Sequence, residues 1–413
     1  MVDNALLTSS AGPLTPEGCS QAPTPASRVL VPLITPYLYG MERAVIEAFD
    51  ALRPEVEPYF VQSSRINGRN PPIIQEMRRR GFPIVLLPDK TDWEPPSRPR
   101  SIRHFLNMMV ALVRSNITIL RAAWGKDILY VPGLRAGLFS VCAALMFRIS
   151  GRRVVHHFHD LGTAMPGARC WFSLVTDCVH NTEFGYRVVR KKFPEIRRKR
   201  NLVVPYILEV KPQIPEDREA CCILEGKRNL FFVGQISRHK GVDILLQAFK
   251  SIAREHQDVM LHLVGGCRED FRRQLDLDLL AEPALIDRVK FWGYREDILH
   301  LLRSAYLYVH SSPPSRFHES FGRSVVEAMA LGVPTVCFRS GALQEIVVHE
   351  KTGLVCDESA ASLAAALNRF LTEINFRNRC GGNARRRYEE LYSALVVRDR
   401  WIQFLRPTKE ATQ

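Results

Sequence analysis

Short apolar runs alternate with amphipathic stretches along the chain from Arg28 onward. Runs rich in Val, Ile, Leu and Phe that end at turn residues are typical of buried strands. The stretches between them carry an apolar residue every three or four positions, as in 241–255, and therefore predict helices. Strands are expected at 28–34, 56–62, 82–88, 127–133, 152–159 and 202–207, and again at 229–237, 259–266, 289–294, 305–311, 334–338 and 352–356. This alternation predicts parallel sheets with crossover helices.

The strand–helix pattern is interrupted once, at 205–228, where Pro and charged residues are frequent. A chain of 413 residues is also too long for one ordinary core. We therefore expect an α/β fold with two Rossmann-like, doubly wound domains. The predicted segments are a disordered tail rich in Pro, Ser and Thr, two domains, and a last helix that crosses back to the first domain: 1–27, 28–207, 208–388 and 389–413.

Composition favours a globular protein, with 46% apolar and 24% charged residues. No apolar run is long enough to span a bilayer, and the best candidate, 136–147, is expected to be a buried helix. The N-terminus lacks the basic start and apolar core of a signal peptide. Ten cysteines are scattered without metal-ligand spacing, so we expect reduced core residues and a cytoplasmic protein.

The chain carries a net charge of +14, and its basic residues cluster at 78–80, 187–200 and 385–387. Such runs could meet a nucleotide phosphate, an anionic membrane or nucleic acid, although each one alone is typical of a solvated face. No nucleic-acid motif and no interleaved aromatic residues accompany them. We therefore expect no nucleic-acid partner.

The stretch 317–334 reads "FHESFGRSVVEAMALGVP" and contains Glu319 and Glu327 eight positions apart. Its apolar spacing predicts a helix over about 321–331 that follows a strand and a loop. In such a unit the start of the helix lies at the sheet edge where doubly wound folds bind ligands. Free amides and the helix dipole favour an anion there. From this stretch alone, a solvated acidic helix and a ligand site both remain open.

Five segments of the second half, taken together, carry a specific pattern. They are "FFVGQISRHKGVDILLQAF", "LHLVGG", "VKFWGYREDILHLLRSAYLYVHSS", "HESFGRSVVEAMALGVPTV" and "GALQEIVVHEKTGLV". On these segments the chain resembles the retaining glycosyltransferases of the GT-B fold, family 4 (glycosyl transferases group 1). The match is firm over about 229–356 and looser in the first half, where "YGMERAV" and "HFHD" resemble family segments.

The resemblance implies that a nucleotide-sugar donor binds to the second domain and the acceptor to the first, without a metal or other cofactor. By the same resemblance, Glu327 would bind the ribose hydroxyls of the donor. Glu319 would contact the donor sugar near the anomeric carbon. The resemblance also places the diphosphate and sugar at the backbone of Ser320, Phe321 and Gly322, and a phosphate at Lys240, six residues after Gly234. Gly40 would let the chain pass close to the phosphates, and His159 would stand at the reacting centre.

Transfer of a sugar expels a nucleoside diphosphate, so a fixed cation and helix-terminal amides would stabilise the growing negative charge. One position departs from the family pattern. Many members carry an arginine directly after the glycine that corresponds to Gly234, whereas this chain has Gln235. Arg238 lies three residues on and is expected to compensate. The departure puts the details of phosphate binding in doubt.

The segment "HHFHD" (156–160) raises the alternative of a metal site. On a strand, His157 and His159 share one face while Asp160 points elsewhere, and no fourth ligand is evident. We therefore expect no metal, and His159 is expected to position a sugar hydroxyl. The "DLD" at 276–278 is interpreted as surface charge on a helix. Glu345 is a weaker candidate in a loop that would approach the donor.

These observations predict a metal-independent, retaining hexosyltransferase-type enzyme of polysaccharide or glycolipid biosynthesis. Its partners would be a nucleotide sugar and a saccharide, lipid-linked or small-metabolite acceptor. In the family the region of 73–87 often faces the acceptor or an anionic membrane, so peripheral membrane contact is a further expectation. Two alternatives stay open, a non-catalytic nucleotide-sugar-binding protein and a GT-B nucleotide-sugar epimerase. A dehydrogenase is disfavoured because "VGGCRED" is no dinucleotide fingerprint.

Overall fold

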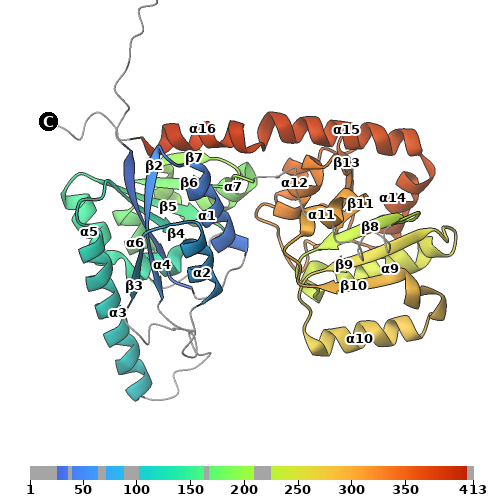
Figure 1. The fold of residues 1–413 in the computed structure, drawn as a ribbon, viewed down its shortest axis with the longest axis horizontal. Helices are drawn as coiled ribbons and strands as arrows, with labels where there is room; N and C mark the ends of the chain where they lie inside the picture. Colours follow the sequence, from blue (N-terminus) through green and yellow to red (C-terminus); the bar gives the residue numbers. More distant parts are fainter. Residues whose placement is uncertain are drawn as a thin grey trace, which may run out of the picture.

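Two α/β units lie side by side and are joined along one side by the last two long helices (Figure 1). The computed structural model describes residues 26–35, 40–63, 71–87, 102–161, 167–208 and 225–406. Each unit is built on one parallel sheet with helices on both faces, as the alternating pattern predicted. Sheets of this kind bury both faces, which explains why their strands are almost continuously apolar.

The first sheet has seven strands in the order β3-β2-β1-β4-β5-β6-β7. The strands are β1 (Ser27–Leu33), β2 (Val56–Ser63), β3 (Ile84–Leu87), β4 (Ile128–Pro132), β5 (Arg153–Phe158), β6 (Asp177–His180) and β7 (Arg200–Val203). The helices around them are α1 (Gly40–Ala51), α2 (Pro72–Arg79), α3 (Ile102–Ala122), α4 (Leu134–Phe139), α5 (Val141–Ile149), α6 (Ala168–Leu174), α7 (Glu183–Lys192) and the 3-10 turn η1 (Pro194–Arg198).

The second sheet has six strands in the order β10-β9-β8-β11-β12-β13, so its first strand is central, as in the first sheet. The strands are β8 (Arg228–Val233), β9 (Val259–Val264), β10 (Val289–Gly293), β11 (Ala305–His310), β12 (Thr335–Phe338) and β13 (Gly353–Cys356). The helices are η2 (Arg238–Lys240), α9 (Val242–Ala253), α10 (Glu269–Leu280), η3 (Pro283–Arg288), α11 (Ile298–Arg303), α12 (Arg323–Ala330), α13 (Leu343–Ile346), α14 (Ala360–Thr372), α15 (Ile374–Leu391) and α16 (Ala394–Leu405).

The structure differs from the sequence prediction in the first unit. Strand β6 was not predicted, because it is short and carries the polar residues Asp177 and His180. Asp177 is buried there because Arg153 on the neighbouring strand pairs with it at 2.9 Å. The stretch 136–147 is not one buried helix but parts of α4 and α5, and α5 leaves Leu145 49% exposed. Of the cysteines expected in the core, Cys142 and Cys170 are exposed, whereas Cys178, Cys337 and Cys380 are buried as free thiols.

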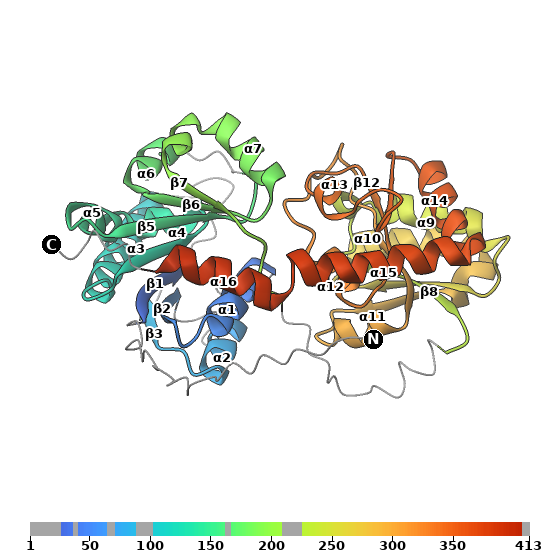
Figure 2. The same cartoon turned by 90° about the horizontal axis from the view of Figure 1, so that it is seen from above.

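The chain returns to the first unit at its end. The last helix was expected within 389–413, whereas the structure has α15 ending at Leu391 on the second unit and α16 beginning at Ala394 on the first (Figure 2). Trp401 and other apolar residues of α16 belong to the core of the first unit. The Ser27 hydroxyl donates a hydrogen bond of 2.9 Å to the carbonyl oxygen of Leu405. In the described part of the chain, no helix is both long and apolar enough to cross a bilayer.

Candidate active site

The loop between β11 and α12 carries Glu319 and leads into the helix predicted from the sequence. Gly322 precedes the first helical residue in the left-handed conformation, with φ of 87°. A Cβ atom there would lie 2.8 Å from a side-chain carbon of Leu343. Within the described residues, the N–H groups of Phe321 and Gly322 have no hydrogen-bond acceptor. The start of α12 therefore offers free donors together with the positive end of the helix dipole.

The Glu319 carboxylate is 7% exposed and is held through one of its two oxygens. Oε1 accepts hydrogen bonds from the Lys240 ammonium, from Nε2 of His310 at 2.9 Å and from the Ser312 hydroxyl at 3.0 Å. Burial alone would raise the pKa of Glu319, but His310 and Lys240 outweigh it and hold the pKa well below its usual range. Oε2 has no partner among the described residues. A fixed, ionised carboxylate thus keeps one oxygen for a ligand.

Lys240 reaches this carboxylate because of the glycine that follows it. Gly241 has a φ of 66°, and a Cβ atom there would lie 2.0 Å from the carbonyl oxygen of Ser311. The Ser311 hydroxyl in turn donates to the carbonyl of Lys240 at 2.8 Å. The Lys240 ammonium also lies 4.1 Å from the centre of the Phe317 ring. An ammonium has three N–H donors, so the bond to Glu319 leaves two for another anion.

A neighbouring loop fixes the backbone of Glu319. The N–H of Ala342 donates to the carbonyl oxygen of Glu319 at 2.8 Å. A Cβ atom at Gly341 would lie 2.2 Å from the same oxygen, so only glycine allows this approach. Gly341 and Ala342 therefore contact the candidate site residue Glu319, and the expected approach of the loop that carries Glu345 to the donor stays a prediction.

Gln235 and Arg238 lie shortly before Lys240 in the chain but are not bonded to this cluster in the described part of the structure. Gln235, which follows Gly234 at the end of β8, is exposed. The Arg238 guanidinium donates to the side-chain oxygen of Gln274 on α10. Within the described ranges, no hydrogen bond or ion pair joins either residue to Lys240 or Glu319. The expectation that Arg238 compensates for Gln235 at the diphosphate therefore gains no support from this geometry.

Glu327 lies on α12 and meets a cation that the prediction overlooked. Arg323 donates from Nε to Glu327 at 2.8 Å and from Nη2 to Glu47 on α1 at 2.7 Å. Burial would lower the pKa of Arg323, but the two carboxylates raise it overall, so the guanidinium stays charged. Burial raises the pKa of Glu47 despite Arg323. Arg323 thus links the two units directly at a candidate donor-binding residue.

Gly40 is the first residue of α1, in the unit opposite α12. A Cβ atom at this position would meet no other atom within 4 Å. The space beside Gly40 is therefore open in this structure, and no packing contact explains the glycine. Its proposed closeness to donor phosphates stays a prediction.

His157 stands at the end of β5 in a network of neutral groups. Asn181 donates its amide to the carbonyl of Phe158 at 3.3 Å, which turns its oxygen toward Nε2 of His157 at 2.9 Å. His157 therefore carries its proton on Nε2, and the Tyr130 hydroxyl donates to Nδ1. Burial is the main cause that lowers the pKa of His157 to about 3.

His159 lies beside His157, with their ring centres 3.9 Å apart, as their shared strand face predicted. Its Nδ1 is 2.7 Å from the Tyr206 hydroxyl, whereas its buried Nε2 has no partner in the described part of the chain. Burial, with the neighbouring histidines, lowers the pKa of His159 well below its usual value. Because burial raises the pKa of Tyr206, that hydroxyl keeps its proton and can donate it to Nδ1. Nε2–H of His159 is then an unused hydrogen-bond donor.

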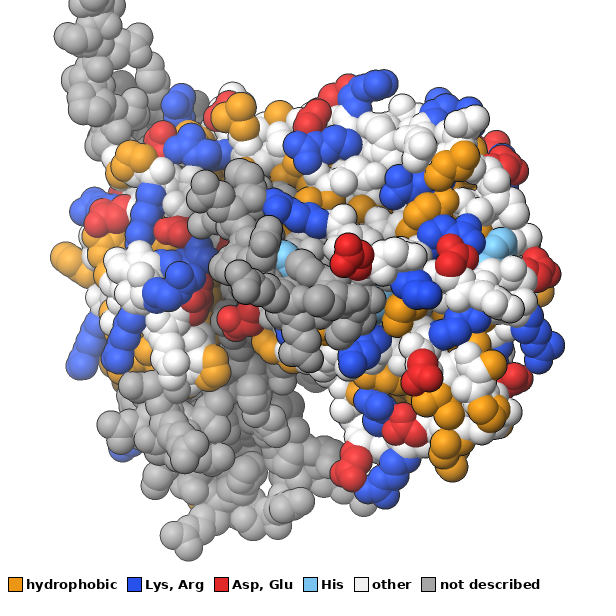
Figure 3. Space-filling view, turned by 45° about the vertical axis from the view of Figure 1, so that its right-hand side comes forward, with side chains coloured by type: hydrophobic (Ala, Val, Ile, Leu, Met, Phe, Trp, Pro, Cys, Tyr) orange, Lys and Arg blue, Asp and Glu red, His pale blue; other side chains and the backbone are white. Residues whose placement is uncertain are grey.

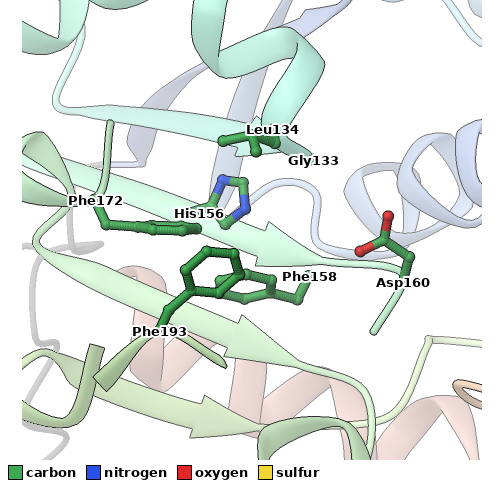
Figure 4. Close-up of a pocket in the computed structure, with 7 residues that line it drawn as sticks. All are labelled: Gly133, Leu134, His156, Phe158, Asp160, Phe172 and Phe193. Carbon is green, nitrogen blue, oxygen red and sulfur yellow. The ribbon is translucent and has the colours of Figure 1, made fainter. Parts of the chain in front are cut away.

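His156 points to the other face of the sheet and lines a small cavity (Figure 4). Trp171 donates to its Nδ1 at 3.2 Å, and burial lowers the pKa of His156 to about 3. The cavity is lined by Gly133, Leu134, His156, Phe158, Asp160, Phe172 and Phe193. No group of three or more His, Cys, Asp or Glu residues in the described ranges is arranged to hold a metal ion. The three histidines thus serve two separate environments.

The two units meet at Ser320. Its hydroxyl donates to the carbonyl of His159 at 2.9 Å, and its carbonyl accepts from the Thr182 hydroxyl at 2.9 Å. The Glu345 carboxylate accepts from the N–H groups of Glu183 and Phe184, at 3.0 and 2.9 Å, across the same junction. Carboxylates favour such a helix start, here that of α7. Glu319 and His159 are thereby brought to one junction.

Comparison with known proteins relates the second unit to one protein family. Residues 213–387 match the family model described as "Glycosyl transferases group 1". The second domain is similar to members of this family. The match contains Lys240, Glu319 and Glu327.

Curated proteins that are similar to the second domain include a "Putative glycosyltransferase YtcC" of Bacillus subtilis. It is 33% identical over 178 residues, which cover 41% of this chain and 43% of the relative. The "Mannosylfructose-phosphate synthase" of Agrobacterium fabrum is 36% identical over 140 residues, which cover 32% of this chain and 30% of the relative. The chain thus spans less than half the length of these relatives.

Solved structures extend the likeness to both domains. Anabaena HepE in complex with UDP and glucose superposes with a TM-score of 0.71 at 19% identity, covering 92% of this chain and 99% of that one. The sucrose-phosphate synthase of Thermosynechococcus elongatus superposes with a TM-score of 0.68 at 19% identity, covering 92% and 98%. The expected GT-B architecture, with two Rossmann-like domains, is confirmed.

Sequence reasoning missed several residues that contact the candidate site. His310 and Ser312 hold Glu319, and the run "VHSS" that contains them was interpreted only as a strand and loop. Arg323 could have been found from its i, i+4 spacing to Glu327, which allows an ion pair on one helix face. Glu47 gave no local signal, because its contact depends on how the two domains meet.

Proposed function

We propose that this protein is a retaining glycosyltransferase that moves a sugar from a nucleotide-sugar donor to an acceptor without a metal ion. The Glu319 cluster carries the proposal, because it places a lysine ammonium and an ionised carboxylate beside the open start of α12. The family of the second domain supports transfer of a sugar. HepE, whose fold is similar, has been solved in complex with UDP-glucose, which makes UDP-sugars the first donors to test.

The chemistry follows from where charge would develop. The donor diphosphate would accept from the free N–H groups of Phe321 and Gly322 and from Lys240. When the bond from the anomeric carbon to the diphosphate oxygen breaks, negative charge grows on that oxygen, and fixed donors there lower the barrier. The acceptor hydroxyl oxygen forms the new bond on the same face, and its proton passes to the leaving diphosphate. Atoms and charge balance without a further reactant.

Neutral His159 would orient a sugar hydroxyl as a hydrogen-bond donor and would not act as a base. Its Nε2–H can donate to a hydroxyl of the donor sugar or of the acceptor, while Tyr206 occupies Nδ1. A general base would need a free lone pair with a pKa near the working pH. The depressed pKa of His159 and the use of its Nδ1 both argue for a donor role.

Glu327 would accept from the ribose hydroxyls of the donor. Its Oε1 already accepts from Arg323, so a bound ribose would share this carboxylate with the guanidinium. The acceptor, a saccharide, a lipid-linked sugar or a small metabolite, would bind on the first domain near His159. Both substrates would then meet where Ser320 joins the two domains.

The first experiment is thermal unfolding of the purified protein with UDP, GDP or ADP in the presence of a chelator. Binding to the folded state raises the melting temperature, because it increases the free energy of unfolding. The increase is about 2.7 kcal/mol when the nucleotide is at a hundred times its Kd. We expect a shift with one nucleotide that is lost in Glu327→Ala. Donor hydrolysis or transfer by the wild type, reduced in Lys240→Ala, would then establish catalysis.

A non-catalytic nucleotide-sugar-binding protein is the second candidate. The exposed Gln235 and the bond between Arg238 and Gln274 favour it, because both leave the diphosphate with fewer cations. This candidate predicts the same thermal shift with neither hydrolysis nor transfer. Absence of a shift with all three nucleotides would reject the proposed donor site.

A further inference from the structure

The outer face of the first domain exposes two apolar stripes. On α3, Leu106, Met109, Val110, Val113 and Ile117 are between 40% and 57% exposed. Their spacing of three or four positions places them on one side of the helix. On α5, Val141, Leu145 and Ile149 follow the same spacing and are 38%, 49% and 79% exposed. Single exposed apolar residues are normal, but two helical stripes together form a patch that is typical of an interaction site.

The two stripes belong to one surface. The backbone N–H of Cys142, in the first turn of α5, donates to the side-chain oxygen of Asn116 on α3 at 3.1 Å. Asn116 also donates to the carbonyl of Leu138 at 3.3 Å. These bonds hold the two helices against each other, on the side of the first domain that faces away from the second (Figures 1 and 2). We call this surface the α3–α5 face.

The charge around the α3–α5 face has one sign. Between 106 and 153 the sequence contains seven Lys and Arg residues and a single acidic residue, Asp127. Asp127 is engaged by Arg28. Arg114, Arg121 and Arg148 are exposed on the two helices, and none of them forms an ion pair with another described residue. An apolar stripe flanked by free cations is complementary to an anionic lipid surface.

The basic helix end at 78–80, which the sequence singled out, is arranged differently. Arg79 and Arg80 both pair with Glu76, at 2.8 and 2.6 Å, and Arg80 also pairs with Asp50 at 2.6 Å. Arg79 and Arg80 are therefore paired within the domain, and exposed Arg78 forms no ion pair with another described residue. On the face drawn in Figure 3, basic and acidic side chains are likewise interspersed. The α3–α5 face differs from both in having free cations beside exposed apolar side chains.

We propose that the α3–α5 face docks the protein onto an anionic lipid bilayer. The apolar stripes would enter the boundary between headgroups and acyl chains, while the arginines meet lipid phosphates. Trp124, just after α3, is 82% exposed and suits the same depth, because its ring is apolar with one polar edge. This mode needs no helix that crosses the membrane. The proposal goes beyond sugar transfer and does not depend on it.

The test is co-sedimentation of the full chain with vesicles of phosphatidylcholine alone or mixed with phosphatidylglycerol. We expect binding to the mixed vesicles, weaker binding at high salt, and little binding to phosphatidylcholine alone. The double variant Val113→Glu, Leu145→Glu should bind at least about tenfold more weakly, since it buries less apolar surface and repels the headgroups. The matched control is Leu277→Glu, Leu280→Glu on α10 of the second domain, where the leucines are 67% and 63% exposed. The control should bind like the wild type.

A second variant separates charge from apolar contact. Arg114→Gln, Arg121→Gln, Arg148→Gln keeps the stripes and should lose most of the dependence on phosphatidylglycerol. Equal melting temperatures for all variants exclude unfolding as the cause. Failure of the wild type to bind mixed vesicles, or equal loss in the α10 control, would overturn the proposal. So would a wild-type dimer, measured by light scattering, that the Val113→Glu, Leu145→Glu change converts to a monomer without any vesicle binding. A negative vesicle result with a normal nucleotide-induced shift would leave the proposed transferase standing.

Discussion

The two domains bring different kinds of buried polar group to their junction. In the second domain, Lys240 and His310 keep the Glu319 carboxylate ionised despite burial. In the first domain, His156 and His157 are buried without a carboxylate partner, and each has its pKa lowered to about 3. One side of the junction therefore holds fixed charge, and the other holds neutral donors and acceptors.

This difference fits a division of labour in sugar transfer. A leaving diphosphate needs fixed positive charge, whereas sugar hydroxyls need neutral hydrogen-bond partners of defined direction. The two requirements favour different environments, because a charge near His159 would change its protonation. Separation of the two clusters onto two domains satisfies both.

The largest expected effect is acid destabilisation of the first domain. His156 and His157 have pKa values of about 3 when folded, below the unfolded value of 6.5, so only the unfolded state takes up their protons as the pH falls below about 6.5. Between about pH 7 and pH 5, protonation of each histidine in the unfolded state should lower the free energy of unfolding by about 2 kcal/mol. Native-state hydrogen exchange, resolved by domain, measures this.

A variant tests the assignment of this acid effect. His157→Gln keeps a donor toward Asn181 but cannot titrate, so its stability should depend less on pH than that of the wild type. An unchanged slope in His157→Gln would contradict the buried neutral histidine.

Removal of the cation should give the next largest effect. Lys240→Ala should lower kcat by about 10²–10³-fold, since one fixed donor to the leaving group is lost. Steady-state transfer assays measure it, with Lys250→Ala as control. Lys250 also holds one hydrogen bond, to the carbonyl of Asp278 at 2.9 Å, but lies away from Glu319. Equal losses in the two variants would mean that Lys240 acts through stability alone.

Glu327→Ala should act on donor binding more than on the chemical step. Loss of a charged hydrogen bond to the ribose should weaken nucleotide binding by about 1.5–3 kcal/mol. Calorimetric titration with the nucleotide that stabilises the wild type measures this. Glu389→Ala is a suitable control, because it also removes an i, i+4 partner of an arginine, Arg385. Wild-type affinity in Glu327→Ala would remove this residue from the donor site.

The smallest effect concerns the contact between the domains. Glu345→Ala removes the acceptor of two N–H groups at the start of α7 and should cost about 1 kcal/mol. Amide exchange at Glu183 and Phe184 should quicken, and the KM for the acceptor should rise more than kcat falls. Unchanged exchange at these two amides would show that the domains part readily in solution.

The second domain was the more predictable half. Three of its strands, β8, β9 and β10, end at glycines, and the helix that starts after Gly322 follows from local spacing alone. Strand β6 escaped prediction because Asp177 is accommodated only by the partner strand. The same limit applies to the site. The bond between Arg323 and Glu47 joins residues 276 positions apart, and no local pattern encodes it. The exposure of α5 likewise depends on what packs against it.

The return of α16 to the first domain has a consequence for synthesis of the chain. Val397, Trp401 and Leu405 belong to the same core as residues of α1 and β1, yet the ribosome adds them only after the whole second domain. The second domain can therefore complete its core first, whereas the core of the first domain is complete only after α16 has been synthesised. A truncation that ends before 394 would spare every candidate catalytic residue and still leave the first domain with an uncovered core.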